Sequence, residues 1–146
     1  MSKAEDYSIK ETELIKRDLK RLKRWRSLGT DIKNVIKITI GYLTDNIVGT
    51  ANCRPKTVFG NHITEAVVGG QKISFYKKRV AIINPKTPPS AGARLVYGYI
   101  EGKNAFIPIL IYAASEEGEY YDINNRKIPL TVSGLVEIIN EKLNSL

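Results

Sequence analysis

One stretch of the chain, residues 75–112, limits most strongly which folds the sequence can adopt. It contains two strand-like runs that carry basic residues, FYKKRVAII and ARLVYGYI, separated by a loop with three prolines. A third run, AFIPILIYA, follows a short turn that contains glycine. Proline is excluded from the interior of a central strand, and a nearly continuous apolar run is typical of a strand buried on both faces. The stretch therefore predicts three consecutive strands of one antiparallel sheet.

The rest of the sheet is predicted around this stretch. Residues 63–68 form a further candidate strand, and Gly69-Gly70 is a strong hairpin signal before a strand over 72–83. The next strands span 93–100 and 105–113, with a turn over 101–104. Pro108 requires an edge or bulge position within the last strand.

Amphipathic patterns predict helices before and after the sheet. Ser8 and Glu11 fit a capping box at the start of a first helix, and Gly29 is a plausible stop. Apolar residues recur along one face of this helix, at Ile15, Leu19, Leu22 and Trp25. Thr30 or Asp31 can cap a second helix. Residues 36–42 also alternate as a strand would, but the start signal and the length of the segment favour a helix.

A C-terminal helix is predicted from apolar residues at Leu135, Ile138, Ile139 and Leu143, with Thr131 or Ser133 as its cap. Together the patterns predict an α+β fold, in which N-terminal helices pack on a four-stranded antiparallel sheet and a C-terminal helix follows. The length of 146 residues favours one domain over residues 1–146.

Charge and composition narrow the class of function. The formal net charge is +8, and residues 54–94 contain eight Lys or Arg but one acidic residue, Glu65. Such an excess favours polyanionic partners. Cys53 and His62 are single and cannot build a zinc site, and no apolar run approaches the length of a membrane span. With no secretory signal visible, we expect a cytoplasmic protein without a metal, a cofactor or a membrane partner.

Alternation along the strands groups the basic side chains. Lys77 and Arg79 share one face of their strand, and Arg94 would join them if the next strand pairs with it. Lys78 lies on the opposite face. The same charges could instead serve only to keep a strand edge from aggregating.

The motifs YKKR (76–79), SAGARLVY (90–97) and LIYAASEE (110–117) follow one another around a proline-rich loop and a short turn. In this order and spacing they resemble the RelE/ParE/HigB toxin superfamily of prokaryotic toxin–antitoxin modules. The resemblance implies a compact RNase-like α+β fold and mRNA cleavage, in many members on the ribosome. It also implies a cognate antitoxin protein as partner.

The chemistry that the resemblance implies needs no metal, because RNA supplies its own nucleophile, the 2′-OH. Arg79 and Arg94 would bind the scissile phosphate, since a planar guanidinium donates two parallel hydrogen bonds to phosphate oxygens. Lys77 would be a phosphate contact or a base, and Tyr112 a base or a stacking residue. Tyr97 suits the core as well as the site. Further RNA contacts are expected from Lys20, Arg24, Lys56, Lys78 and Lys86.

Two other functions stay open. A ParE-like protein would share the fold but inhibit DNA gyrase, and a nucleic-acid-binding module on an unrelated α+β fold would bind through the basic N-terminal helix without catalysis. The chain also departs from the family pattern. Ala114 stands where the family often has a lysine, so activity would rely on Lys77 and Lys78, or be weak or lost.

Overall fold

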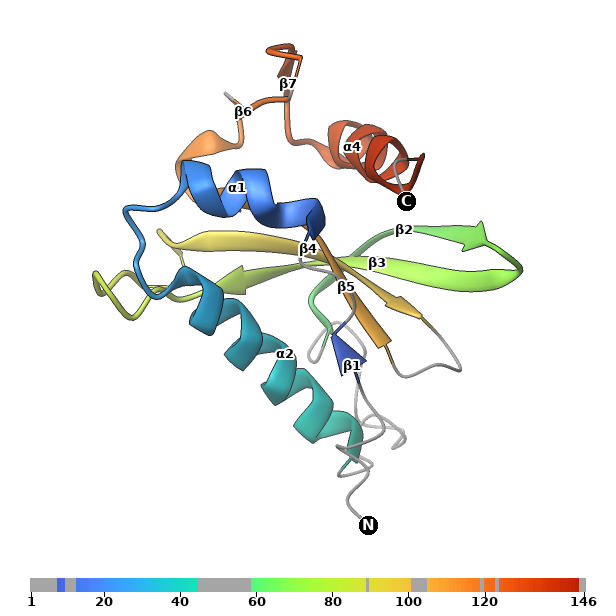
Figure 1. Ribbon diagram of the computed structural model, residues 1–146, viewed down its shortest axis with the longest axis horizontal. Helices are drawn as coiled ribbons and strands as arrows, with labels where there is room; N and C mark the ends of the chain where they lie inside the picture. The colour runs from blue at the N-terminus through green and yellow to red at the C-terminus, as the bar shows by residue number, and fades with distance from the viewer. Residues whose placement is uncertain are drawn as a thin grey trace.

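The computed structural model describes residues 8–9, 13–44, 59–88, 90–100, 105–118, 120–122 and 124–144. A central sheet of long antiparallel strands has helices on both of its faces (Figure 1). The long strands are β2 (Asn61–Val68), β3 (Gln71–Val80), β4 (Ala93–Ile100) and β5 (Ala105–Ala113). The predicted α+β class, with a four-stranded antiparallel sheet and a C-terminal helix, is confirmed.

The long strands follow one another across the sheet in the order β5-β4-β3-β2, so each pairs with its neighbour in the chain. Gly69 and Gly70 connect β2 to β3 with φ angles of 57° and 79°, which is the left-handed backbone that a tight hairpin requires. β3 ends at Val80 rather than at the predicted residue 83. It ends early because Ile82 leaves the ladder and bridges Thr87 within the β3–β4 loop.

β5 accommodates its proline with a bulge, as the sequence predicts. Tyr97 lies opposite Pro108 but Val96 lies opposite Leu110, which leaves Ile109 as the additional residue. The ladder is interrupted at this point, so the missing N–H of proline is tolerated. All nine residues of β5 are buried, as expected of a strand covered on both faces.

The start of the chain differs from the predicted helix. Ser8, the expected cap, lies in the short strand β1 (Ser8–Ile9), which runs parallel to β5 with Ser8 opposite Ala105. Glu11, its expected partner, lies outside the described residues. The capping-box prediction was wrong because the backbone of Ser8 pairs with the open edge of β5, a long-range interaction that a local motif does not reveal.

The first helix is also shorter than predicted. A 3-10 turn, η2 (Glu13–Ile15), leads into α1 (Lys16–Arg21), and the chain then turns until Ser27. The apolar spacing that suggested a longer helix reflects the burial of Leu22 and Trp25 in this turn.

The second helix, α2 (Leu28–Thr44), is a helix as predicted but begins before Thr30. Gly29 therefore lies in its first turn and ends no helix. The Ser27 hydroxyl donates to Oδ2 of Asp31 at 2.6 Å, and this carboxylate also accepts the N–H of Ile83 at 3.2 Å. Asp31 thus ties the start of α2 to the β3–β4 loop.

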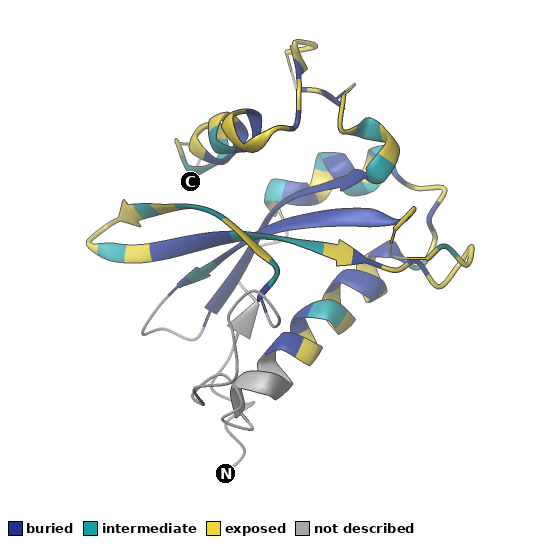
Figure 2. Cartoon of the chain, turned by 180° about the vertical axis from the view of Figure 1, so that it is seen from behind, coloured by how far each residue is buried: buried dark blue, intermediate teal, exposed yellow. Residues whose placement is uncertain are grey.

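The sheet separates two apolar layers, and β4 and β5 lie between them (Figure 2). One layer packs Ile32 and Ile36 of α2 against the sheet. Tyr97 belongs to this layer, and its hydroxyl donates to the carbonyl of Phe59 at 2.5 Å, which makes it a core residue. The other layer packs Leu135 and Ile138 of α4 (Val132–Asn144) against the opposite face.

α4 begins at one of the two predicted caps. The N–H of Gly134 donates to the Thr131 hydroxyl at 3.4 Å, so Thr131 rather than Ser133 is the capping residue. The preceding chain passes very close to the helix, because a Cβ on Gly134 would lie 1.8 Å from the carbonyl oxygen of Pro129. A small hairpin, β6 (Tyr120–Tyr121) and β7 (Lys127–Ile128), connects the turn η3 (Ala114–Glu116) to α4.

Charged side chains cover the part of the β5 edge that β1 leaves open. Lys142 and Arg21 donate to the carbonyls of Ile109 and Ile111 at 2.5 and 3.1 Å. Asp18 accepts the N–H of Ile111 at 3.4 Å, and Glu116 accepts the N–H of Ala113 at 2.8 Å. We call the four charged residues, Asp18, Arg21, Glu116 and Lys142, the edge cluster.

The edge cluster is also internally paired. Asp18 lies 2.6 Å from Arg21 and 3.2 Å from Lys142, and Arg21 lies 2.8 Å from Glu116. The cluster therefore replaces a further strand and joins α1, β5 and α4.

Candidate functional site

The predicted catalytic residues lie on one face of the sheet. Arg79 of β3 is directly opposite Arg94 of β4, and Arg94 is directly opposite Tyr112 of β5. Residues directly opposite each other in antiparallel strands project from the same face. Lys77 precedes Arg79 by two residues and shares this face. We call Lys77, Arg79, Arg94 and Tyr112 the basic row.

Like charges directly opposite each other destabilise a sheet. The facing of Arg79 and Arg94 therefore creates a position where an anion would be stabilised. Arg79 is exposed and Lys77 is half-buried, so both can reach a bound anion.

Arg94 is buried and already holds part of the site together. Its guanidinium donates to the carbonyls of Ala93 and Ser90 at 3.2 and 3.1 Å, which anchors the end of the β3–β4 loop. Its Nε lies 3.8 Å from Oε1 of Glu117, whose side chain is half-exposed. A phosphate that approaches Arg94 would compete with this carboxylate.

Tyr112 is fully buried, so its ring is not open to stacking by an RNA base. Its hydroxyl is one of the buried side-chain atoms in the described residues that has no hydrogen-bond partner. Burial, reinforced by the charge of Glu117 and opposed by that of Arg94, raises the pKa of Tyr112 well above its usual value. The phenol is therefore protonated at neutral pH, where it can donate a hydrogen bond but cannot accept a proton as a base.

The predicted RNA-binding residues are spread over the molecule. Lys78 projects to the opposite face from Lys77 and donates to the Thr39 hydroxyl of α2 at 3.2 Å; burial lowers its pKa. Lys86 is exposed in the β3–β4 loop. Lys56 lies outside the described residues.

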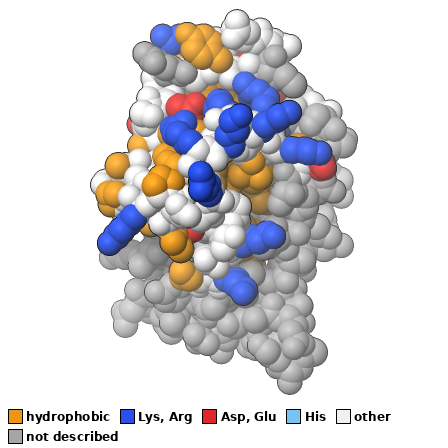
Figure 3. All heavy atoms as spheres, turned by 60° about the vertical axis from the view of Figure 1, so that its left-hand side comes forward, with side chains coloured by type: hydrophobic (Ala, Val, Ile, Leu, Met, Phe, Trp, Pro, Cys, Tyr) orange, Lys and Arg blue, Asp and Glu red, His pale blue; other side chains and the backbone are white. Residues whose placement is uncertain are grey.

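Lys20 and Arg24 belong to a second basic surface, formed by α1, the following turn and α2. The acidic residues of segment 16–37 are Asp18 and Asp31, and both are buried and bonded within the protein. The exposed charges of the segment are therefore all positive: Lys16, Lys20, Lys23, Arg24, Arg26, Lys33 and Lys37. We call these seven residues the helical basic face. Figure 3 shows Lys and Arg side chains gathered on one side of the molecule, with few Asp or Glu side chains between them.

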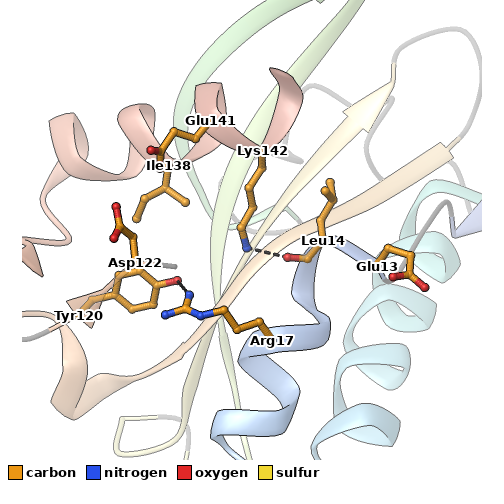
Figure 4. Close-up of a pocket in the computed structure, with 8 residues that line it drawn as sticks. All are labelled: Glu13, Leu14, Arg17, Tyr120, Asp122, Ile138, Glu141 and Lys142. Carbon is orange, nitrogen blue, oxygen red and sulfur yellow. Dashed lines mark hydrogen bonds between the residues drawn. The ribbon is translucent and has the colours of Figure 1, made fainter. Parts of the chain in front are cut away.

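A pocket of about 410 Å³ lies between η2, α1, β6 and α4 (Figure 4). Its cations are bonded to protein acceptors. Arg17 donates to the Tyr120 hydroxyl at 3.1 Å and to the carbonyl of Tyr121, and Lys142 donates to the carbonyl of Leu14 at 2.7 Å. The pocket borders the edge cluster, and these bonds join α1 to β6 and η2 to α4.

Sequence reasoning did not assign a role to Glu117, the last residue of the LIYAASEE motif. The turn η3 brings this residue back to Arg94, and a local sequence pattern carries no signal for that contact. Ala114, at the position of the expected lysine, is the first residue of η3.

Comparison with protein-family models, with curated proteins and with solved structures finds no match to this chain. Among the described helices, none has both the length and the apolar character that a membrane crossing needs. The described residues also contain no group of three or more His, Cys, Asp or Glu side chains placed to hold a metal ion.

Proposed function

We propose that the chain is a toxin of a toxin–antitoxin module that binds mRNA on the basic row and cleaves it without a metal. The observation that carries the proposal is the alignment of Arg79, Arg94 and Tyr112 across three neighbouring strands. The sequence resemblance to RelE-like toxins supports the same reading. Such a protein would act in the cytoplasm, on free or ribosome-bound mRNA, and be neutralised by an antitoxin.

The row suits the chemistry of phosphodiester cleavage. The exposed guanidinium of Arg79 can bind two phosphate oxygens, and Arg94 and Lys77 add positive charge around the phosphorus. Preorganised donors of this kind stabilise the pentacoordinate phosphorus without a metal.

The first test is expression of the chain in a bacterial host, with transcript ends mapped within minutes. The second is an assay of the purified protein on free and on ribosome-bound RNA, in the presence of a metal chelator. We expect new 5′ ends within messages. Arg79→Ala should lower the cleavage rate by about 10²–10³-fold, the cost of losing one transition-state donor. Arg79→Lys should recover little of it, because a lysine keeps the charge but loses the planar fork.

Lys127→Ala is the matched control, since Lys127 is an exposed cation on β7 outside both basic surfaces. Intact transcripts in cells whose growth has stopped would contradict the proposal, and inhibition of DNA gyrase in those cells would favour the ParE-like alternative. Equal cleavage by Arg79→Ala and the wild type would contradict the assignment of the row.

The helical basic face favours a second candidate function, nucleic-acid binding without cleavage. Seven exposed cations, one of which, Lys16, lies 3.8 Å from the exposed carboxylate of Glu13, form a surface for phosphates. If this face dominates, the affinity for nucleic acid falls steeply as the salt concentration rises. The double variant Lys20→Ala with Arg24→Ala should make the slope of log affinity against log salt concentration shallower, by the amount expected for about two lost phosphate contacts. No RNA cleavage would then be seen under any condition.

A further inference from the structure

The basic row contains no carboxylate and no histidine, and its lysine, Lys77, can take a proton from the RNA only after it has lost the positive charge with which it would bind phosphate. Cleavage through the 2′-OH needs a base close to the phosphate-binding residues. Tyr112 is buried and protonated, and its raised pKa excludes it from this role at neutral pH. The strands β3, β4 and β5 contain no acidic residue and no histidine.

A carboxylate reaches the row from outside the sheet. Glu117 follows η3, and the N–H of Leu130 donates to its backbone carbonyl at 2.8 Å, which fixes the turn in place. Its carboxylate lies 3.8 Å from Nε of Arg94. The side chain is about half-exposed, with 50% of its surface accessible, so an incoming RNA strand can meet it.

The neighbouring carboxylate, that of Glu116, serves a different purpose. As a member of the edge cluster, it accepts hydrogen bonds from Nε–H of Arg21 at 2.8 Å and from the N–H of Ala113 at 2.8 Å. Two adjacent acids thus face different parts of the fold. Glu116 is engaged in structure, whereas Glu117 is directed to the basic row.

We infer that Glu117 is the general base of the basic row. This inference rests on the proposed function. Phosphate binding by Arg79 and Arg94 would place the scissile group next to this carboxylate. The groups that face Glu117 are the guanidinium of Arg94 and the phenol of Tyr112, with Arg79 one strand further along the row.

The reaction step balances with these groups and water. The Glu117 carboxylate accepts the proton of the 2′-OH while the 2′-oxygen forms a bond to phosphorus. The bond between phosphorus and the 5′-oxygen breaks, and this oxygen takes a proton from water. The products carry a 2′,3′-cyclic phosphate and a 5′-OH, and Glu117 returns its proton to solvent.

The experiment compares wild type, Glu117→Gln, Glu117→Asp and the control Glu137→Gln in single-turnover cleavage. Glu137 is an exposed carboxylate on α4 that pairs with Arg126, away from the row. Each protein is assayed on free and on ribosome-bound RNA between pH 4.5 and 8. Binding is measured separately with a 2′-O-methyl RNA that has no nucleophile.

We expect Glu117→Gln to bind the analogue within about threefold of wild type, because the variant keeps the volume of the side chain and removes an anion that competes for Arg94. Its cleavage rate should fall by at least about 10²-fold, the usual contribution of a positioned base. The rise in rate with pH over the range where carboxyl groups ionise should also disappear. Glu117→Asp should cleave at an intermediate rate and keep that rise, and Glu137→Gln should match the wild type.

Cleavage by Glu117→Gln within about threefold of an active wild type would overturn the role of Glu117 and leave the proposed function standing. Slow cleavage by Glu117→Gln with the wild-type pH profile would also overturn the role of Glu117 as a base. This result is expected if Glu117 only positions Arg94. If Glu117→Gln fails to fold, a Glu117→Asp variant that loses the pH dependence overturns the inference. A wild type that cleaves neither free nor ribosome-bound RNA would overturn the proposed function and this inference together.

Discussion

The edge cluster gives a sharp test of how the fold is held together, through the substitution Asp18→Asn. The Asp18 side chain is fully buried and accepts hydrogen bonds from Arg21 at 2.6 Å, Tyr120 at 3.2 Å, Lys142 at 3.2 Å and the N–H of Ile111 at 3.4 Å. Asparagine has nearly the same shape, but it has no charge and turns an NH₂ group toward donors. The substitution therefore leaves two cations without their common partner.

The magnitude follows from the burial of those cations. Removal of one member of a buried ion pair costs about 3–5 kcal/mol. The side chains of Arg21 and Lys142 keep 26% and 20% of their surface exposed, and Arg21 keeps its pair with Glu116. We therefore expect the free energy of unfolding to fall by about 3 kcal/mol, at the lower end of that range.

Urea unfolding followed by far-UV circular dichroism measures this change. With a slope of about 2 kcal/mol per molar urea, the midpoint should fall by about 1.5 M. The control is Glu13→Gln, the same chemical change at a side chain that is 70% exposed and 3.8 Å from Lys16. This control should lie within about 0.5 kcal/mol of wild type. An Asp18→Asn midpoint within about 0.3 M of wild type would refute the view that the edge cluster holds α1 and α4 to β5.

Two further substitutions test other contacts. Burial, as the largest cause, raises the pKa of Tyr120 to about 12, so the stability that this phenol contributes is present below about pH 10 and is lost as the pH rises toward 12. In this window the unfolding free energy of the wild type should fall by up to about 1.4 kcal/mol per pH unit more than that of Tyr120→Phe. Urea midpoints from about pH 9 to about pH 11.5 measure the difference. Gly134→Ala places a methyl group 1.8 Å from the Pro129 carbonyl oxygen and should lower the unfolding free energy by about 2–3 kcal/mol. At Gly29 the new methyl group meets no atom within 4 Å apart from its chain neighbours and the backbone of its own helix. Gly29→Ala should therefore be neutral or stabilising by up to about 1 kcal/mol in the same urea assay, and equal effects at the two glycines would contradict this reasoning.

The long strands were predictable because their signals are local. Residues 93–100 and 105–113 are bounded by prolines, glycines and a change of hydrophobic pattern, and both strands match the prediction to the residue. The N-terminal segment was not predictable in this way. Its two-residue strand and short helix exist because β5 has an open edge, and that edge becomes available only when the sheet forms.

The candidate site was predictable only where its residues lie close together in the sequence. Alternation places Lys77 and Arg79 on one face, but the pairing of Arg79 with Arg94 depends on the register across a loop of twelve residues, 81–92. The burial of Tyr112 depends on how the chain after β5 packs. The approach of Glu117 to Arg94 depends on η3, a turn for which the sequence carried no prediction.

The distribution of the acidic residues links stability to the proposed binding of RNA. In segment 16–37 the fold places Asp18 in the edge cluster and Asp31 against the β3–β4 loop, so both acids stabilise the interior. The nearby cations Lys20 and Arg24 are left exposed without acidic neighbours from the same segment. Because the buried acids and the exposed cations are different residues, loss of Asp18 should weaken the fold, whereas loss of Lys20 or Arg24 should weaken polyanion binding alone. The net charge of +8 thus understates how positive this side of the molecule is, since the count includes acids that no partner can reach.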